Sequence, residues 1–178
     1  MENTTNPQVE IVTEFGTIVL EIAQDVAPIT AANFLNYVDS GAYNNTSFYR
    51  TVLMDNQPDN DVKIEVIQGG LGMTAVTGPL RNQPIPLERT EKTGLKHVDG
   101  TLSMARLAAD SATSEFFICI NDQPELNYGG KRYADGQGFA AFGHVVSGQD
   151  VVRKIQVSAH EKQELTPNIA ILKVQRVG

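Results

Sequence analysis

The sequence of 178 residues predicts a mainly β fold, a compact antiparallel barrel or sandwich with two helices packed on it. Three observations support this prediction. About eight short segments carry the apolar alternation and β-prone residues of strands. Only two segments have the helical period. The strands are not separated by regular helices, as they would be in a doubly wound fold, and closing the sheet into a barrel would remove its exposed edges.

The N-terminal half begins with a hairpin pattern. Residues 8–22, QVEIVTEFGTIVLEI, hold two alternating runs joined near Gly16. The next segment, PITAANFLNYVDSGAY, predicts a helix, because Pro28 suits the first turn, apolar residues recur on one face and Gly41 ends it. Strand character returns in SFYRTVL at 47–53, and the polar segment DNQPDNDVK at 55–63 predicts a turn-rich loop.

The second half alternates strands with irregular loops. IEVIQGGLG predicts a short strand that ends in paired glycines, and residues 73–100 show little period of either kind. Further strands are expected in TLSMARL, EFFICIN, FAAFGHVV and IAILKVQRV, and a second helix in GQDVVRKIQV. Loops are expected at AADSATS and at NYGGKRYADGQG. We expect residues 8–178 to form a single domain behind a polar lead, residues 1–7.

Composition excludes several classes of function. The formal charge is −7 and the pI about 4.9, so phosphate backbones would be repelled and no nucleic-acid partner is expected. No run reaches the roughly 20 apolar residues of a membrane span, so no membrane insertion is expected. Cys119 is expected to be a small buried hydrophobe. The histidines His97, His144 and His160 lack metal-ligand spacing, so neither a metal nor another cofactor is expected.

Common catalytic motifs are absent from the chain. There is no nucleophile elbow and no H-E-x-x-H, and IQGGLG lacks the spacing and lysine of a phosphate loop. In SFYR, strand alternation predicts that Phe48 and Arg50 point to the same face. If Phe48 faces the core, Arg50 is directed towards an interior or groove surface. It would then be either a salt-bridged structural residue or a functional cation.

Five segments in order resemble the signature blocks of the cyclophilins, the peptidyl-prolyl cis-trans isomerases. They are SFYR, VIQGG, GTLSMAR, SATSEFFICINDQPELN and GFAAFGHVVSGQDVV, and the similarity extends over residues 8–177 and is greatest to bacterial members. The resemblance implies a closed eight-stranded antiparallel β-barrel capped by two α-helices, with the substrate groove outside. It implies isomerisation of X–Pro bonds to assist protein folding, with proline-containing polypeptide segments as partners and a monomeric state.

The resemblance also assigns roles to individual positions. Arg50 matches the catalytic arginine by its F-x-R context, donating to the prolyl nitrogen as the bond twists. Phe139 falls where the family has His or Tyr, so it could pack on the proline ring but not hydrogen-bond. The positions that match substrate-binding residues are Val66, Gln68, Ala105, Arg106, Phe117, Leu126 and Phe139.

Three glutamates depart from the family pattern. Glu115 stands where a glutamine usually holds substrate, Glu125 where an aromatic residue forms the pocket rim, and Glu65 about where a phenylalanine lies. The long 55–63 segment could move Glu65 out of the site. Either drift has weakened the activity, or the carboxylates make an acidic groove that favours Lys or Arg near the proline. We expect altered preference with retained activity.

Two further expectations follow from the resemblance. Loss of the rim aromatic at Glu125 implies weak cyclosporin binding. The alternative function is a cyclophilin-like module that binds proline peptides or acts as a chaperone, with little or no isomerase activity. As written, MENTTNPQ lacks a signal-peptide pattern, which suggests the cytoplasm. The similarity of NPQVEIVTEFG to the mature starts of exported bacterial cyclophilins suggests the periplasm, if a signal peptide has been removed.

Overall fold

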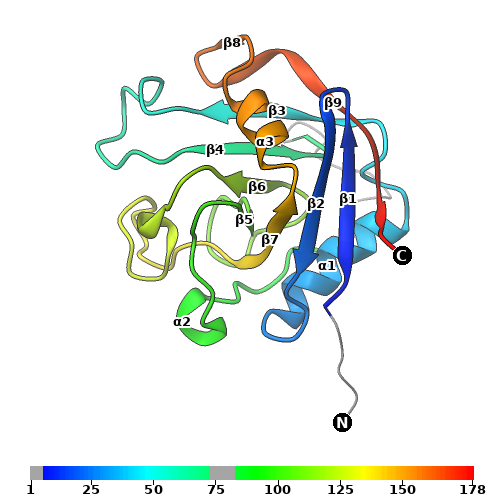
Figure 1. The fold of residues 1–178 in the computed structure, drawn as a ribbon. Coiled ribbons are helices and arrows are strands. Elements are labelled where there is room, and N and C mark those ends of the chain that lie inside the picture. Colours follow the sequence, from blue (N-terminus) through cyan, green and yellow to red (C-terminus); the bar gives the residue numbers. More distant parts are fainter. Residues whose placement is uncertain (1–5, 73–82) are drawn as a thin grey trace.

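A computed structural model describes residues 6–72 and 83–178 (Figure 1). Its helices are α1 (Pro28–Asp39), α2 (Thr90–Thr93) and α3 (Gln149–Gln156), and a 3₁₀ turn spans Pro124–Leu126. Its strands are β1 (Gln8–Thr13), β2 (Gly16–Ile22), β3 (Thr46–Val52), β4 (Val66–Gly70), β5 (Thr101–Met104), β6 (Phe116–Cys119), β7 (Ala141–Ser147), β8 (His160–Glu161) and β9 (Glu164–Arg176). Part of the loop expected at 73–100 lies outside the described residues.

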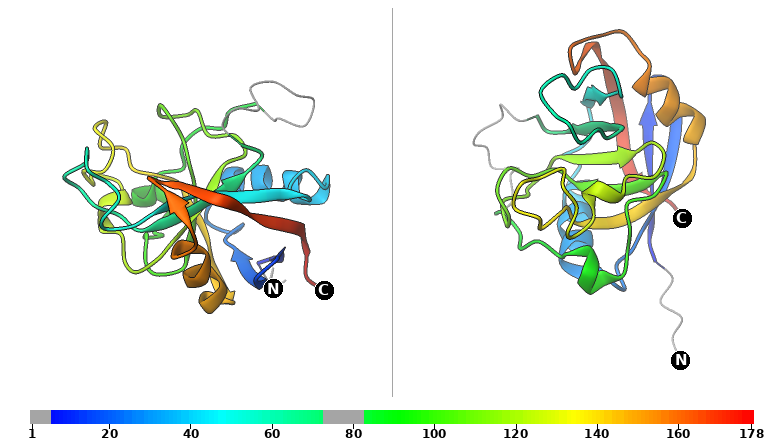
Figure 2. Two further views of the ribbon diagram at one scale, coloured as in Figure 1. Left: turned by 90° about the horizontal axis from the view of Figure 1, so that it is seen from above. Right: turned by 90° about the vertical axis from the view of Figure 1, so that its left-hand side faces the viewer.

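Eight strands close into an antiparallel barrel. The strand order is β1-β2-β7-β5-β6-β4-β3-β9, and β1 pairs with β9 to complete the ring. The two-residue strand β8 pairs with the beginning of β9 and lies outside the ring. The turned views show β9 running beside the N-terminal hairpin (Figure 2). The prediction of a closed eight-stranded antiparallel barrel is therefore confirmed.

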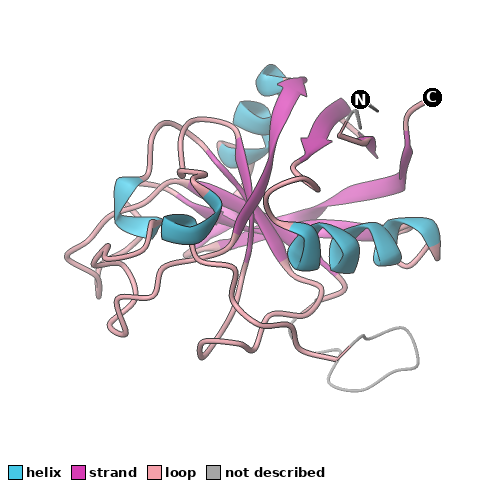
Figure 3. Cartoon of the chain, turned by 90° about the horizontal axis from the view of Figure 1, so that it is seen from below, coloured by secondary structure: helices cyan, strands magenta, loops and turns pink. Residues whose placement is uncertain are grey.

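The helices lie around the outside of the strands (Figure 3). The helix α1 buries Ala31, Phe34, Leu35 and Val38 on one face, as its apolar spacing predicts. In α3, Asp150 lies in the first turn, and the last turn holds two basic residues, so both ends suit the helix dipole. The four-residue α2 was not predicted, because one helical turn leaves no periodic pattern in the sequence.

The apolar interior has two separate parts. The main core fills the barrel, where neighbouring aromatic ring centroids lie 5.2 to 5.8 Å apart. A smaller cluster lies on the outer face of the sheet and includes Val66, Phe117 and Leu126. The strand β6 supplies both parts, since alternate residues point to opposite faces. Its Cys119 is 1% exposed in the outer cluster, and burial raises the pKa of the thiol, as expected for a small hydrophobe.

A β-bulge in β3 directs the side chain of Arg50 to the outer face of the barrel. The register of β3 against β4 shifts between Phe48, which pairs with Gly69, and Arg50, which pairs with Gln68, so Tyr49 is the extra residue. Phe48 is fully buried in the main core, whereas Arg50 lines a cavity on the outer face. The expectation that these side chains share a face is therefore wrong, because a bulge reverses strand alternation.

Candidate active site

A cavity of about 550 Å³ opens on the outer face of the barrel, above β3, β4 and β6. Loops 53–65 and 127–140 form its rim. The residues that line it are Arg50, Asn60, Ile64, Val66, Gln68, Ala105, Arg106, Leu107, Phe117, Leu126, Arg132, Tyr133, Ala134 and Phe139. Eight of the ten predicted site residues are therefore brought together in one cavity. Glu115 and Glu125 are not among the lining residues.

Arg50 is half-buried and held by two amides. Its Nη1 donates to Oε1 of Gln68 at 2.9 Å, and its Nε and Nη2 donate to Oε1 of Gln163 at 3.0 and 2.8 Å. A guanidinium has five N–H donors, so one N–H on each Nη atom has no hydrogen bond to the described residues. Burial lowers the pKa of Arg50 from its ordinary value. The guanidinium is fixed in place and still has donors to offer.

A chain of polar contacts continues from Gln68. Its Nε2 donates to Oη of Tyr49 at 2.9 Å, and that hydroxyl donates to Oε1 of Glu115 at 3.3 Å. Glu115 also accepts from the backbone N–H of Gly72 and from the hydroxyl of Ser114. Burial raises the pKa of Tyr49, and the charge of Glu115 raises it further. The hydroxyl of Tyr49 therefore stays protonated and remains a donor.

The floor of the cavity is apolar. Phe117 is 5% exposed, and the ring of Phe139 meets it edge-on with centroids 5.6 Å apart. Ile64, Val66 and Leu126 complete the buried apolar surface. Desolvated apolar walls suit a ring of about proline size, while the neighbouring Arg50 supplies a donor.

His97 supports this floor from below. Its imidazole stacks on Phe117 with centroids 6.0 Å apart and an interplanar angle of 15°. The two ring nitrogens lie 2.8 Å from Oδ1 of Asn127 and from Oγ of Ser103. Burial lowers the pKa of His97 to about 4. The ring is therefore neutral at neutral pH and orients Phe117 without adding charge.

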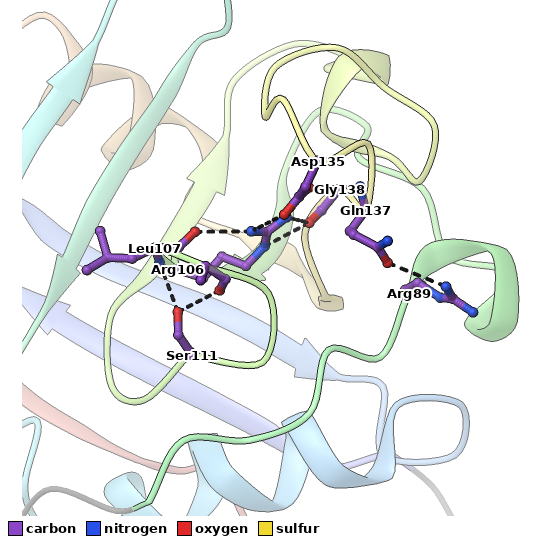
Figure 4. A network of polar contacts seen from close by, with 8 residues as sticks. Arg89, Arg106, Leu107, Ser111, Asp135, Gln137 and Gly138 are labelled. Atoms are coloured by element: carbon purple, nitrogen blue, oxygen red, sulfur yellow. Dashed lines mark hydrogen bonds and ion pairs between the residues drawn. The ribbon is translucent and has the colours of Figure 1, made fainter.

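Arg106 braces the rim of the cavity (Figure 4). Its five donors are all used, on both carboxylate oxygens of Asp135 and on the carbonyls of Leu107 and Gly138. Its side chain is 1% exposed and lies over the rings of Tyr133 and Phe139, 4.3 and 4.9 Å from their centroids. The guanidinium therefore holds the rim loop and has no donor left for a ligand.

Comparison with known proteins agrees with this geometry. The model of the cyclophilin-type peptidyl-prolyl cis-trans isomerase family matches residues 8–176. The chain belongs to this family. Its reaction is the isomerisation of X–Pro peptide bonds, and the predicted family and enzyme class are confirmed.

Curated bacterial relatives and solved structures are similar over most of the chain. Peptidyl-prolyl cis-trans isomerase B of Escherichia coli is 38% identical over 147 residues, 81% of this chain and 80% of that protein. Isomerase A of Dickeya dadantii is 37% identical over 153 residues, 85% and 72% of the two chains. A crystal structure of a Cryptosporidium parvum cyclophilin-type isomerase has a TM-score of 0.77 at 22% identity, covering 97% of this chain and 98% of that one, which shows the shared fold.

The three unusual glutamates of this cyclophilin do not make the cavity acidic. Glu115 is 3% exposed and bonds within the protein, as described above. Glu125 accepts from the backbone N–H of Lys131 at 2.8 Å, and Glu65 accepts from Asn121 and Gln156 on the side of α3. The described lining contains three arginines and no carboxylate, so the expectation of an acidic groove is corrected.

Sequence reasoning missed three residues that contribute to the site of this cyclophilin. Gln163 reaches Arg50 from the turn between β8 and β9, and Arg132 enters from the glycine-rich loop before Phe139. His97 lies under the floor. For Arg132 the sequence did offer a signal, because the basic pair Lys131-Arg132 lies between Leu126 and Phe139, two positions matched to the pocket. No sequence pattern pointed to Gln163 or His97.

The described part of the chain holds neither a metal-like cluster of side chains nor a helix that could cross a membrane. In residues 6–72 and 83–178, no cluster of three or more His, Cys, Asp or Glu side chains has the arrangement of a metal site. In the same residues, no helix has the length and apolarity needed to cross a membrane.

Proposed function

We propose that the isomerase acts through Arg50, which binds the twisted X–Pro bond more tightly than either planar isomer. Twisting the amide removes its resonance, and the barrier is roughly 18–20 kcal/mol. The prolyl nitrogen then regains a lone pair, which an N–H of a fixed guanidinium stabilises. The observation that supports this role is that Arg50 keeps two uncommitted donors while amides hold its other three beside an apolar pocket.

The proline ring is proposed to sit on Phe117, between Leu126, Val66 and the edge of Phe139. These side chains belong both to the cavity lining and to the apolar cluster on the outer face of the sheet. A proline ring placed there loses water on one face, while its nitrogen remains close to the polar side of the cavity. Phe139 contributes packing and no hydrogen bond.

The peptide backbone is proposed to run along Ala105 and Arg106, just beyond the end of β5. The N–H of Ala105 is already bonded to the carbonyl of Glu115 at 3.0 Å. The N–H of Arg106 has no partner among the residues that the structure describes. An extended segment could therefore pair with this edge by its main chain. The amide of Gln68 retains one N–H and one lone pair for the same backbone.

The experiment compares the wild type with Arg50→Ala and Arg50→Lys in a protease-coupled isomerisation assay on a neutral X–Pro peptide. We expect Arg50→Ala to lose at least about tenfold in kcat/KM, equivalent to about 1.4 kcal/mol. Lysine keeps the positive charge but lacks the planar set of N–H donors of a guanidinium. The kcat/KM of Arg50→Lys should therefore be little higher than that of Arg50→Ala. Arg153→Ala, which removes an exposed arginine of α3, is the matched control. A folded wild type that leaves the uncatalysed rate unchanged would favour the binding-module alternative.

Three finer properties are proposed with this function. Weak cyclosporin binding is supported by Glu125, whose carboxylate bonds to its own loop where the family has a rim aromatic. An inhibition titration tests it, and nanomolar inhibition would contradict it. A monomeric state and a periplasmic location after signal removal are the other two. Gel filtration and cell fractionation test them, with a dimer or a cytoplasmic protein as the contrary results.

A further inference from the structure

The three arginines of the cavity differ in how many of their N–H donors form hydrogen bonds within the protein. Arg106 uses all five and is paired with Asp135. Arg50 uses three, all on amides. Arg132 uses only its Nη1, which donates to Oε1 of Gln57 at 2.6 Å and to the carbonyl of Val62 at 2.7 Å. Its Nε and both hydrogens of Nη2 have no partner in the described part of the chain.

Arg132 is held in place rather than loose in solvent. Its acceptor Gln57 is 3% exposed, and the Gln57 amide also bonds to the backbone of Leu53 and Ile64. Loop 55–63 is thereby tied to the 127–140 loop across one end of the cavity. A guanidinium anchored at one nitrogen and open at the other two has the bidentate geometry that binds carboxylate or phosphate.

The charge of Arg132 is also uncompensated. Within residues 6–72 and 83–178, neither Arg132 nor Arg50 forms an ion pair with a carboxylate. Arg132 is half-buried, and burial together with the charge of Arg50 lowers its pKa. Two cations that repel one another across a shared cavity are both stabilised when an anion enters it.

We propose that Arg132 forms an anion subsite, so that the groove prefers proline segments with an acidic side chain directly before or after the proline. The proposal rests on the proposed function, since it concerns peptides seated in the same cavity. It reverses the preference for Lys or Arg that the sequence suggested. A carboxylate of Asp or Glu and a phosphate on Ser share the chemistry that such a subsite recognises.

The alternative is that Arg132 only braces the two loops. A brace would need the bonds to Gln57 and Val62 but would give no preference among peptides. The net charge of the chain, −7, would by itself disfavour acidic peptides, so a preference for them requires a local cation. The preference should also weaken at higher ionic strength, because salt screens the attraction between Arg132 and the acidic side chain of the peptide.

The test uses peptides Ala-Xaa-Pro-Ala and Ala-Ala-Pro-Xaa, with Xaa as Glu, phosphoserine, Ala or Lys. NMR exchange gives kcat/KM, and NMR titration gives Kd whether or not turnover occurs. In one of the two positions, we expect Glu to exceed Ala by roughly three- to tenfold and Lys to fall below Ala. The phosphoserine arm distinguishes the two sources, since a phosphate subsite would favour it further over Glu.

Arg132→Gln should bring the ratio of Glu to Ala close to one, and Arg132→Lys should keep part of it. The matched control is Lys131→Gln, which removes the same charge from an exposed neighbour outside the cavity and should leave the wild-type ratio. Equal binding of Glu, Ala and Lys peptides by the wild type would overturn the proposal. So would an equal effect of both Gln variants. A wild type that binds with the expected preference but does not isomerise would contradict the proposed function alone.

Discussion

Arg50 and Gln163 are joined through a single amide oxygen: Oε1 of Gln163 accepts from both Nε and Nη2 of Arg50, at 3.0 and 2.8 Å. The other end of this amide donates to the carbonyl of Asn56 at 3.1 Å, so the turn before β9 is tied to the loop after β3. The pair fixes the plane of the guanidinium. Gln163 is therefore a positioning residue, which need not touch the substrate.

Removing this support should slow the reaction without unfolding the protein. We expect Gln163→Ala to lose roughly fivefold in kcat/KM, about 1 kcal/mol, because a released guanidinium must be ordered during catalysis. The loss should fall mainly on kcat. Glu161→Ala, an exposed change in the same hairpin, is the control and should retain the wild-type rate. If both variants match the wild type, Gln68 alone orients Arg50.

The fold could be predicted from sequence because its signals are local. Apolar alternation along β6 places Phe116 and Phe117 on opposite faces, and each faces its own apolar cluster in the structure. Pro28 and Gly41 mark the ends of α1 by their backbone preferences. These patterns depend on neighbours in the chain, so one sequence contains them in full.

The parts that could not be predicted depend on distant contacts. Gln163 lies 113 residues from Arg50, and no periodic pattern links them. The bulge at Tyr49 adds one residue to β3, and no residue type in this strand marks its position. The path of the rim loop depends on Gly130, where a Cβ would lie 2.2 Å from the carbonyl oxygen of Glu125. Only the folded chain shows that this loop brings Arg132 into the cavity and that the glutamates bond elsewhere.

Because Arg106 holds the 127–140 loop through Asp135 and Gly138, a substitution of Arg106 should loosen that loop. A lysine at this position has three donors on one atom, so Arg106→Lys cannot bond Asp135 and Gly138 together as the fork does. We expect KM to rise roughly threefold as Phe139 loses its support, and trypsin to cut more rapidly after Lys131. Peptide mapping during limited proteolysis measures this.

A matched change at Arg89 controls for the loss of an arginine from the same network. Arg89 donates to Gln137 at 3.4 Å (Figure 4). It is also paired with Glu91 near the surface. Arg89→Lys should therefore leave the cleavage rate close to that of the wild type. An Arg106→Lys protein that resists trypsin as the wild type does would show that the loop is held by other contacts.

The role of Glu115 predicts a loss of stability and no change in charge preference. Gln is the usual residue of the family, yet Glu115→Gln would turn an amide NH₂ towards groups that now donate to the carboxylate, such as Tyr49 or Gly72. We expect the free energy of unfolding to fall by about 1–3 kcal/mol in urea. Glu125→Gln, which keeps an amide oxygen to accept its one exposed bond from Lys131, should cost less than about 0.5 kcal/mol. A variant whose preference among Glu, Ala and Lys peptides changes would place the Glu115 carboxylate in the groove.

The buried imidazole of His97 predicts how stability depends on pH. Its pKa is about 4 in the folded protein because burial disfavours the charged form, whereas the ordinary value is 6.5. Between these two values the unfolded chain binds a proton that the folded protein does not, so the free energy of unfolding falls as the pH falls. The effect is complete near pH 4 and amounts to about 3 kcal/mol. Above pH 6.5 the imidazole is neutral in both states and contributes no pH dependence.

Urea unfolding of the wild type and His97→Gln at about pH 7, 5.5 and 4.5 measures this contribution. The variant should lose stability at neutral pH, because its side chain cannot stack on Phe117 as the ring does, but its stability should fall less between pH 7 and pH 4.5. His144→Gln is the control, since it removes an exposed histidine from the surface, and this change should leave the acid dependence close to that of the wild type. Parallel curves for the wild type and His97→Gln would show that the imidazole is protonated in place. Phe117 would then rest on a charged ring at acidic pH, and its packing would have to tolerate that charge.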